Sequence, residues 1–371
     1  MEDEQARAEQ WRLRCQEVGI LYADAAEREV RANARIAELE AELASEHARI
    51  EQILGSHSWK LTEPLRRVRR RPPAGEPSQP AEGPDEALFE ARMRAAYDAR
   101  AASWPQPEPR TFNEKMWQRR LVDRRPFLRT HCDKHASYEA AAKILPAEVM
   151  PQRFARVDTV AQLADLELPR EYIVKIRHGS GGSAVVWDGP PTQGSGWVHP
   201  WIRKSYPASD DPLPRIAEDL AECMRHDYGW DALEWGYLGV PRQLIVEELF
   251  RGPNGELPRD LCLYVFHGRV ECMQVATDRQ RDGERSSGWH DRDWNYLPIG
   301  LTIDPRPQPR PANVEEAIEM AEAFVGDEDF VRVDFLQTDR GLKFSEITPY
   351  SHGGNANFRT QWADEFLGGL W

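Results

Sequence analysis

Apolar residues recur at every third or fourth position over residues 5–54, a stretch that contains no proline. The spacing fits a single heptad frame and predicts an N-terminal coiled-coil helix, through which the chain would form a homodimer or associate with another protein. Glu29 and Glu46 fall on seam positions of that frame, where a charge weakens pairing but fixes register or oligomer state. The alternative is a single amphipathic helix that packs on the body of the protein.

The composition changes after this helix. Residues 59–71 combine Trp59 and Leu65 with five arginines, and such a basic segment predicts either a solvated surface or peripheral contact with anionic lipid. Residues 72–84 are rich in proline, glycine, glutamate and serine, which is typical of a disordered linker. We therefore assign the coiled-coil helix and basic junction to residues 1–64, the linker to 65–88 and a globular domain to 89–371.

Within the globular domain, helical and strand periodicities follow one another without the regular strand–helix alternation of a parallel sheet. Short apolar runs separated by tight turns predict antiparallel hairpins, so the expected fold class is α+β. Helices are expected at residues 86–102, 113–122, 131–144, 213–226 and 314–325, and strands at 171–187, 243–250, 260–266 and 269–277.

The composition argues against some classes of binding partner. The formal net charge of -14 and the pI near 5.3 argue against a nucleic-acid partner, because a phosphate-binding surface usually needs a basic excess. The chain has no run of about 18 apolar residues, and its acidic start lacks the features of a signal peptide. We expect a cytoplasmic protein, with any membrane contact peripheral at the inner face of the plasma membrane. The 5 cysteines form no C-x-x-C pair, as suits reduced thiols.

The most informative segment is a predicted hairpin near the carboxyl end. Two short apolar strands, at residues 330–335 and 344–348, each carry one inward carboxylate, Asp334 and Glu346, and a D-R-G turn separates them. Paired carboxylates repel one another unless a cation lies between them, so the pattern predicts a magnesium site, and magnesium suggests a nucleotide. Arg332 alternates onto the same face, where it either stabilises a transferring phosphoryl group or forms a structural ion pair with Asp334.

A second segment fits the same nucleotide. The strand YIVKI at residues 172–176 runs into a glycine-rich loop, and AVVW at 184–187 continues as another strand. Glycines let backbone N–H groups close on phosphate oxygens, while Lys175 adds a positive charge. The lysine precedes the glycines, so the loop is not a Walker A motif. The candidate phosphate-binding loop, called the flap below, comprises His178, Gly179, Ser180, Gly181, Gly182 and Ser183.

Taken in order, these segments resemble the ATP-grasp superfamily. The sequences TFNEK at residues 111–115, DK at 133–134 and EIT at 346–348 resemble its TupA-like branch, which is named for teichuronopeptide biosynthesis. The resemblance covers about residues 89–371. It implies two antiparallel sheets that clamp ATP and Mg²⁺ between them.

The resemblance also implies roles for individual residues. Lys175 becomes a ligand of the α- and β-phosphates, Lys134 the second ATP lysine, and the amides of the flap a lid. Without the flap, Lys134 would be read as an ordinary surface lysine on a helix. In the sequence VEELF at 246–250, Glu247, Glu248 and Leu249 resemble the hinge that reads the adenine edge and the ribose hydroxyls, and either glutamate could serve.

The remaining implied roles concern the metal and the reaction. Asp334 and Glu346 are the metal ligands that the resemblance implies, and Arg332 is a catalytic residue. Arg279 and Arg285, in a polar stretch rich in charge, are the arginines expected to hold an anionic acceptor.

Two positions depart from the family pattern. Cys262 stands where the family commonly has a lysine near the phosphates or the substrate, and a thiol cannot replace that charge. Arg269, Arg279 or Arg285 must compensate, or the catalytic step is impaired. Thr348 stands where an amide commonly completes the metal coordination, and it supplies only a weaker hydroxyl ligand.

The expected function follows from the resemblance. An ATP-grasp ligase would join an amino acid or another amine to a glycan carboxylate through an acyl phosphate, in bacterial surface polysaccharide biosynthesis. The coiled coil would then recruit other enzymes of that process. One alternative is a sugar kinase on the same fold. Another is a non-catalytic adaptor that binds nucleotide or glycan and is recruited through the coiled coil.

Overall fold

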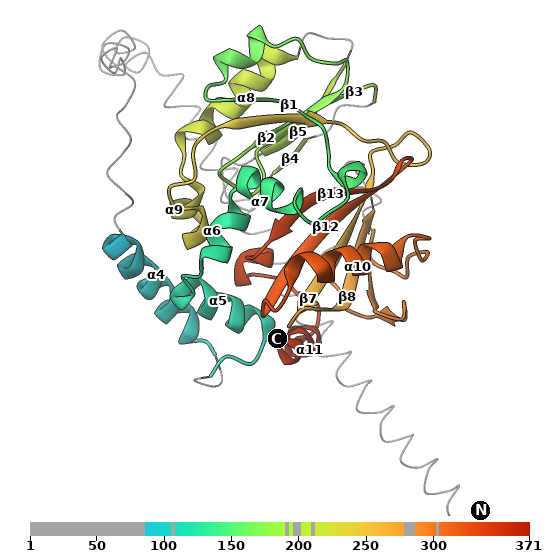
Figure 1. The fold of residues 1–371 in the computed structure, drawn as a ribbon. Helices are drawn as coiled ribbons and strands as arrows, with labels where there is room; N and C mark the ends of the chain where they lie inside the picture. Colours follow the sequence, from blue (N-terminus) through green and yellow to red (C-terminus); the bar gives the residue numbers. More distant parts are fainter. Residues whose placement is uncertain are drawn as a thin grey trace, which may run out of the picture. The chain divides into compact units, whose positions relative to one another are not determined.

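The computed structural model (Figure 1) places all of its described residues in the unit Ala81–Trp371. The predicted coiled coil, most of the predicted linker, and both Arg279 and Arg285 lie outside the described residues. Helix α4 (Glu86–Ala101) begins inside the segment that we assigned to the linker, so residues 86–88 are helical. The described residues are 86–104, 108–189, 193–195, 202–208, 212–277, 286–301 and 304–371.

Sheet A is the six-stranded sheet, with the strand order β1-β6-β2-β3-β5-β4. All of its neighbours pair antiparallel except β3 and β5, which run parallel. Side chains alternate along β2: Tyr172, Val174 and Ile176 are buried in the core beside helix α8 (Leu213–Arg225), so Lys175 points to the other face. The strands are β1 (Arg153–Val157), β2 (Tyr172–Ile176), β3 (Ser183–Trp187), β4 (Gln193–Ser195), β5 (Ile202–Pro207) and β6 (Leu244–Glu248).

Sheet B has seven strands in the order β10-β9-β8-β7-β12-β13, and β11 pairs with β9. Helix α10 (Val314–Val325) covers one face, as Figure 1 shows, and packs on apolar residues such as Leu263 and Val333. The alternate residues, among them Cys262 and Asp334, occupy the opposite face. The strands are β7 (Arg259–Phe266), β8 (Arg269–Thr277), β9 (Ser286–Asp291), β10 (Tyr296–Leu297), β11 (Asp304–Pro305), β12 (Phe330–Thr338) and β13 (Gly341–Thr348).

The expected α+β class with antiparallel hairpins is confirmed. One predicted helix is wrong: residues 131–144 form two helices that separate at Asp133, whose backbone is extended at φ -86 and ψ 106. The Asp133 carboxylate caps the second helix by accepting from the His135 and Ala136 amides, and it also pairs with Arg177.

None of the described helices is both long and apolar enough to cross a bilayer. The other helices are α5 (Phe112–Val122), α6 (Pro126–Cys132), α7 (Lys134–Ala141), α9 (Tyr228–Ala232), α11 (Gln361–Leu370) and the 3-10 turns η1 (Ala147–Val149), η2 (Ala161–Asp165), η3 (Trp235–Tyr237) and η4 (Ser351–Gly354).

The TFNEK sequence is the start of α5. Thr111 is its N-cap, and Glu114 completes a capping box by accepting the Thr111 amide. The Asn113 side chain forms two hydrogen bonds with the backbone of Ala356. Its Nδ2 donates to the Ala356 carbonyl at 3.0 Å, and its Oδ1 accepts from the Ala356 amide at 2.8 Å. This residue therefore ties the helix to the chain that follows β13.

Three further side chains of α5 donate to backbone carbonyls of residues 349–354, the segment that directly follows β13. Trp117 donates to the Gly354 carbonyl at 3.0 Å, Arg119 to the Pro349 carbonyl at 2.9 Å and Arg120 to the Gly353 carbonyl at 2.6 Å. Within this segment His352 adopts a left-handed φ of 57, which is strained for a residue other than glycine. The hydrogen bonds from α5 hold the chain in that conformation.

Glu234 precedes η3 and is buried beside the same segment. Its side chain approaches Gly353, where an added Cβ would lie 3.1 Å from Oε1. Burial raises the pKa of this carboxyl to about 8, although the nearby Arg120 acts in the opposite sense. Glu234 is therefore protonated at neutral pH in the folded protein but ionised in the unfolded chain.

This difference makes stability depend on pH. Because the pKa of Glu234 is raised on folding, its favourable contribution is complete below the unfolded pKa near 4.5 and is lost as pH rises to about 8. Glu234→Gln should remove this loss, so its free energy of unfolding relative to wild type should rise by up to about 1.4 kcal/mol per pH unit across that window. Urea unfolding at pH 5, 6.5 and 8 measures the free energy of unfolding of the variant and of wild type, and Glu365→Gln, at an exposed position, is the control. Parallel pH profiles for wild type and Glu234→Gln would contradict the assignment.

Candidate functional site

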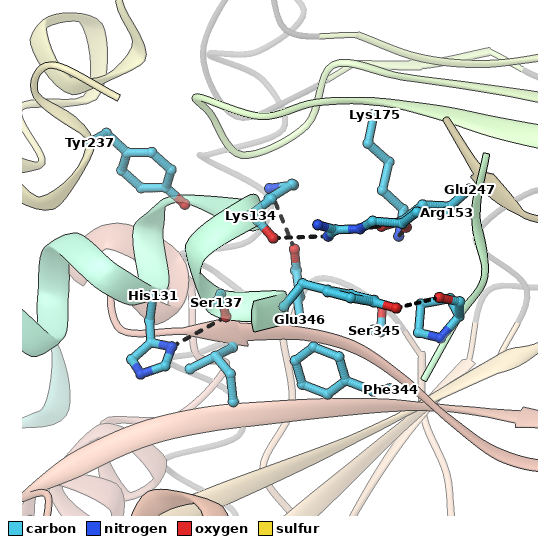
Figure 2. A pocket seen from close by; sticks show the side chains of 13 residues that line it. His131, Lys134, Ser137, Arg153, Lys175, Tyr237, Glu247, Phe344, Ser345 and Glu346 are labelled. Atoms are coloured by element: carbon cyan, nitrogen blue, oxygen red, sulfur yellow. Dashed lines mark hydrogen bonds and ion pairs between the residues drawn. The ribbon is translucent and has the colours of Figure 1, made fainter. Parts of the chain in front are cut away.

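The candidate site is a cleft between sheets A and B (Figure 2). Lys175 of β2, Glu247 of β6 and Arg153 of β1 line it from sheet A, and the Phe344–Ile347 stretch of β13 lines it from sheet B. Residues of α6, α7 and η3 close one side, including His131, Lys134, Ser137, Tyr138 and Tyr237. The cleft therefore unites the strand before the flap with the acidic hairpin, as the sequence predicted.

Lys134 connects these two predicted elements. Its ammonium donates to the Gly179 carbonyl of the flap at 2.7 Å and lies 3.7 Å from the Glu346 carboxylate. Figure 2 shows the side chain between the two walls of the cleft. Burial lowers the pKa of Lys134, and the positive charges of Lys175 and Arg203 lower it further, while Glu346 opposes them. The lysine is thus a partly buried member of the cleft, with 16% of its side chain exposed, rather than an ordinary surface residue.

Glu247 is the acid of sheet A that faces the cleft. Lys175 Nζ lies 2.7 Å from one of its oxygens, and Arg153 Nε lies 2.9 Å from the other. Burial alone would raise the pKa of Glu247, but the two cations outweigh burial and hold the pKa below its usual value. The carboxylate is ionised and fully compensated.

Glu248 takes a different position. It pairs with Arg340 in the turn of the acidic hairpin, at 2.6 Å. It also lines a neighbouring hollow that shares Tyr138 and Pro151 with the cleft and is walled by Met150. Leu249 follows the end of β6, is half-buried and does not line the cleft. The two glutamates, which the sequence left interchangeable, therefore lie in different surroundings.

The flap follows β2 and pairs back through β3, as predicted. Gly181 and Gly182 have φ of 88 and 61, and the Gly182 carbonyl accepts from the Ile176 amide at 2.9 Å. A Cβ on Gly182 would come within 2.9 Å of the Ile176 side chain, so the turn requires glycine. The flap therefore returns the chain to β3, whose first residue Ser183 is paired with Lys175.

His178 and Ser180 are turned toward helices rather than into the cleft. His178 is buried with its Nε2 3.3 Å from the Cys223 carbonyl of α8, and burial lowers its pKa to about 4, so the ring is neutral. Ser180 bonds to the hydroxyl of Tyr228 in α9. These contacts anchor the flap, and the structure does not bring either side chain to the cleft residues.

The acidic hairpin is confirmed. Asp334 of β12 and Glu346 of β13 are directly opposite in register, and a bulge follows this pair. Arg332 forms a fork on Asp334, with Nε and Nη2 at 2.7 and 2.6 Å from its two oxygens, and Nη2 lies 3.5 Å from Glu346. Burial raises the pKa of Asp334 although Arg332 opposes it, and the charge of Glu346 adds to the increase. Of the two alternatives left open for Arg332, the structural ion pair with Asp334 is present.

The donor set fits a magnesium ion shared with a nucleotide. Across the described residues, no three His, Cys, Asp or Glu side chains are placed to hold a metal by themselves. Mg²⁺ is usually bound through one or two carboxylates, with waters and phosphate oxygens completing the octahedron. Asp334 and Glu346 provide that number, and Glu346 is the more exposed of the two, at 31% against 1% for the side chains. Thr348 also lies here, but its hydroxyl accepts from Arg332 at 3.2 Å.

The position of Cys262 is also settled by register. Cys262 lies opposite Asp334 on the neighbouring strand β7 and is buried on the same face. Arg269 cannot compensate for the missing lysine, because it lies at the other end of the β7–β8 hairpin, opposite Phe266, and pairs with Glu271. Arg332, whose fork holds the facing Asp334, is a cation close enough to Cys262 for the two groups to interact electrostatically.

Sequence reasoning missed Arg153. Besides binding Glu247, its guanidinium donates to the Lys134 carbonyl at 3.0 Å and lies 3.7 Å from the centroid of the Tyr138 ring. It therefore joins sheet A to the start of α7. The only signal in the sequence was an arginine at the start of a short alternating run, RFARV, which we did not assign to a strand.

Residues 213–371 match the family model described as "TupA-like ATPgrasp". No curated protein matches the chain. Among solved structures, the D-alanine–D-alanine ligase of Bacillus anthracis aligns at 13% identity with a TM-score of 0.32, over 59% of this chain and 57% of that chain. The ATP-grasp ligase PsnB with its minimal precursor aligns at 14% with a TM-score of 0.35, over 77% and 75%. The aligned part thus spans less than two thirds of the Bacillus ligase.

Substitution of Glu247 tests the charge balance of sheet A. Glu247→Gln should lower the free energy of unfolding by about 3 kcal/mol at pH 7, because two partly buried cations lose their shared, buried carboxylate. The matched control is Glu248→Gln, which removes a half-exposed pair with Arg340 and should cost about 1 kcal/mol or less. Chemical denaturation of both variants measures the difference. Equal losses in the two variants would contradict the ion-pair arrangement described above.

Proposed function

We propose that the protein is an ATP- and Mg²⁺-dependent ligase that joins a carboxylate to an amine. One observation carries the proposal: Lys134 lies between the flap and Glu346, so phosphate-binding groups and metal-binding groups face each other across one cleft. The match of residues 213–371 to the ATP-grasp family model supports ATP as the nucleotide. Related folds are described as D-alanine–D-alanine ligase complexed with ATP and as PsnB complexed with Mg and ADP.

In the proposed complex, the groups on the two walls of the cleft bind different parts of the nucleotide and the metal. The cations Lys134 and Lys175 neutralise the phosphates, and the apolar hollow beside Met150 and Pro151 takes the base next to the end of β6. Glu247 or Glu248 accepts from the ribose hydroxyls, and Glu247 lies on the same wall as Lys175. Asp334 and Glu346 would hold Mg²⁺, which would offset the negative charge of the phosphates.

The proposed reaction has two steps. The acceptor carboxylate takes the γ-phosphoryl group and ADP leaves, and the amine then attacks the acyl carbon and releases phosphate. Arg332 would offset charge that develops near the metal, because its guanidinium already touches both acids. Closure of the flap over the phosphates would exclude water from the acyl phosphate.

The substrate class and the partners are proposals from family analogy. We infer an acidic sugar or a polymer-linked amino acid of a bacterial surface glycan as the acid, and an amino acid or amine as its partner. Arg279 and Arg285 remain the arginines predicted to hold the anionic acceptor. The basic segment at 59–71 remains a candidate for contact with anionic lipid.

Loss of either metal ligand should abolish turnover. Purified protein with ATP, Mg²⁺ and pools of uronic acids and amines should release ADP only when both an acid and an amine are present. Asp334→Asn and Glu346→Gln should each lower this rate by a factor of about 10³ or more, since the phosphoryl group loses its metal. Asp339→Asn, in the exposed turn of the same hairpin, is the control and should leave the rate unchanged. Formation of a phosphorylated sugar that needs no amine would indicate a kinase instead.

We also propose that residues 5–54 mediate dimerisation. Light scattering of the full chain should give twice the mass of the monomer, whereas a chain that starts at Ala81 should give the monomer mass. The heptad pattern supports this because apolar seam positions are buried only by a second helix. A monomeric full chain at micromolar concentration would disprove the coiled coil.

A further inference from the structure

A third cation lies on the cleft face of sheet A. Lys175 of β2 is opposite Ser183 of β3, and Ser183 is in turn opposite Arg203 of β5. Residues that are paired across neighbouring strands point to the same face of a sheet. The register therefore extends one row of side chains from Lys175 past the end of the flap to Arg203.

The neighbours of Arg203 on β5 confirm which face it occupies. Lys204 Nζ and the Tyr206 hydroxyl both lie 2.5 Å from the carboxylate of Asp219, which belongs to α8. Helix α8 packs on the face of sheet A that is opposite the cleft. Lys204, which directly follows Arg203, and Tyr206 both face α8, so the alternation of side chains along the strand turns Arg203 and Ser205 to the other face.

Lys134 approaches the same part of sheet A. Its ammonium donates to the Gly179 carbonyl of the flap at 2.7 Å, and the flap joins β2, which carries Lys175, to β3, which pairs with the strand of Arg203. Three cations, from α7, β2 and β5, thus approach one another at the base of the flap. Like charges at short range repel, and a bound polyanion would relieve that repulsion.

The strand order assigns an end of the nucleotide to Arg203. From the β6 side of sheet A, which carries Glu247, the strands follow in the order β6, β2, β3 and β5. Arg203 is two strands beyond Lys175, a separation of about 10 Å at ordinary strand spacing. The row therefore leads away from the base and the ribose toward the terminal phosphate.

We propose that Arg203 binds the terminal phosphate of the nucleoside triphosphate and makes the cleft select a triphosphate over a monophosphate. This inference rests on the proposed function, because it takes ATP as the ligand. A guanidinium fork matches the oxygens of a phosphate group, and an arginine held on a strand needs no large rearrangement to present it.

A series of nucleotides tests the assignment. Calorimetric titration with AMP, ADP and a non-hydrolysable ATP analogue, each with Mg²⁺, measures affinity as phosphates are added. Arg203→Gln should weaken binding of the ATP analogue by about 10- to 100-fold, weaken binding of ADP less, and leave the affinity for AMP unchanged. Arg203→Lys, which keeps the charge, should recover much of the lost affinity.

The adjacent Lys204→Gln is the matched control, because it removes one positive charge from the same strand on the opposite face. It should lower the melting temperature and leave all three affinities unchanged. An equal loss for AMP, ADP and the analogue in folded Arg203→Gln would show that the arginine only shapes the flap, and no loss would exclude a contact; either result overturns the inference. Failure of the wild-type protein to bind any of the nucleotides would instead overturn the proposed function.

Discussion

The position of Lys134 is the constraint on which the cleft depends. It is the first residue of α7, where the partial positive charge of a helix N-terminus disfavours a cation, and burial disfavours the charge again. The chain offsets these costs locally, with the Asp133 cap before it, the Gly179 carbonyl and the Glu346 carboxylate. A lysine in this place stabilises the fold little, so its presence is better explained by an anionic ligand than by packing.

Much of this arrangement could be predicted from local sequence patterns. Period-two alternation and a tight turn defined the acidic hairpin, so the facing positions of Asp334 and Glu346 followed from geometry alone. The same reasoning located the two strands around the flap, because glycine is needed where φ is positive. The helix expected at residues 113–122 was likewise found as α5, whose side chains then hold the segment after the hairpin.

What could not be predicted depends on partners that are distant in the sequence. Alternation shows that Glu247 and Glu248 face opposite ways, but only Lys175 on the neighbouring strand shows which of them faces the cleft. His178 lies in the glycine loop that suggested phosphate binding, and its contact with the Cys223 carbonyl of α8 turns it away from the cleft. The helix break at Asp133 has the same origin, since Arg177 fixes the carboxylate that caps α7.

The charge balance of the acidic hairpin explains how Arg332 can have both of the roles that the sequence left open. Two carboxylates with no cation nearby would strongly destabilise the hairpin. The Arg332 fork, together with Lys134 at 3.7 Å from Glu346, supplies two positive charges that offset the two negative charges. A divalent ion would add two positive charges to these four groups, and the phosphates of a nucleotide would then offset that excess. The two cations thus let the hairpin fold without metal, while a bound metal ion is balanced only when a polyanion binds with it. This coupling favours joint binding of Mg²⁺ and nucleotide over binding of either alone.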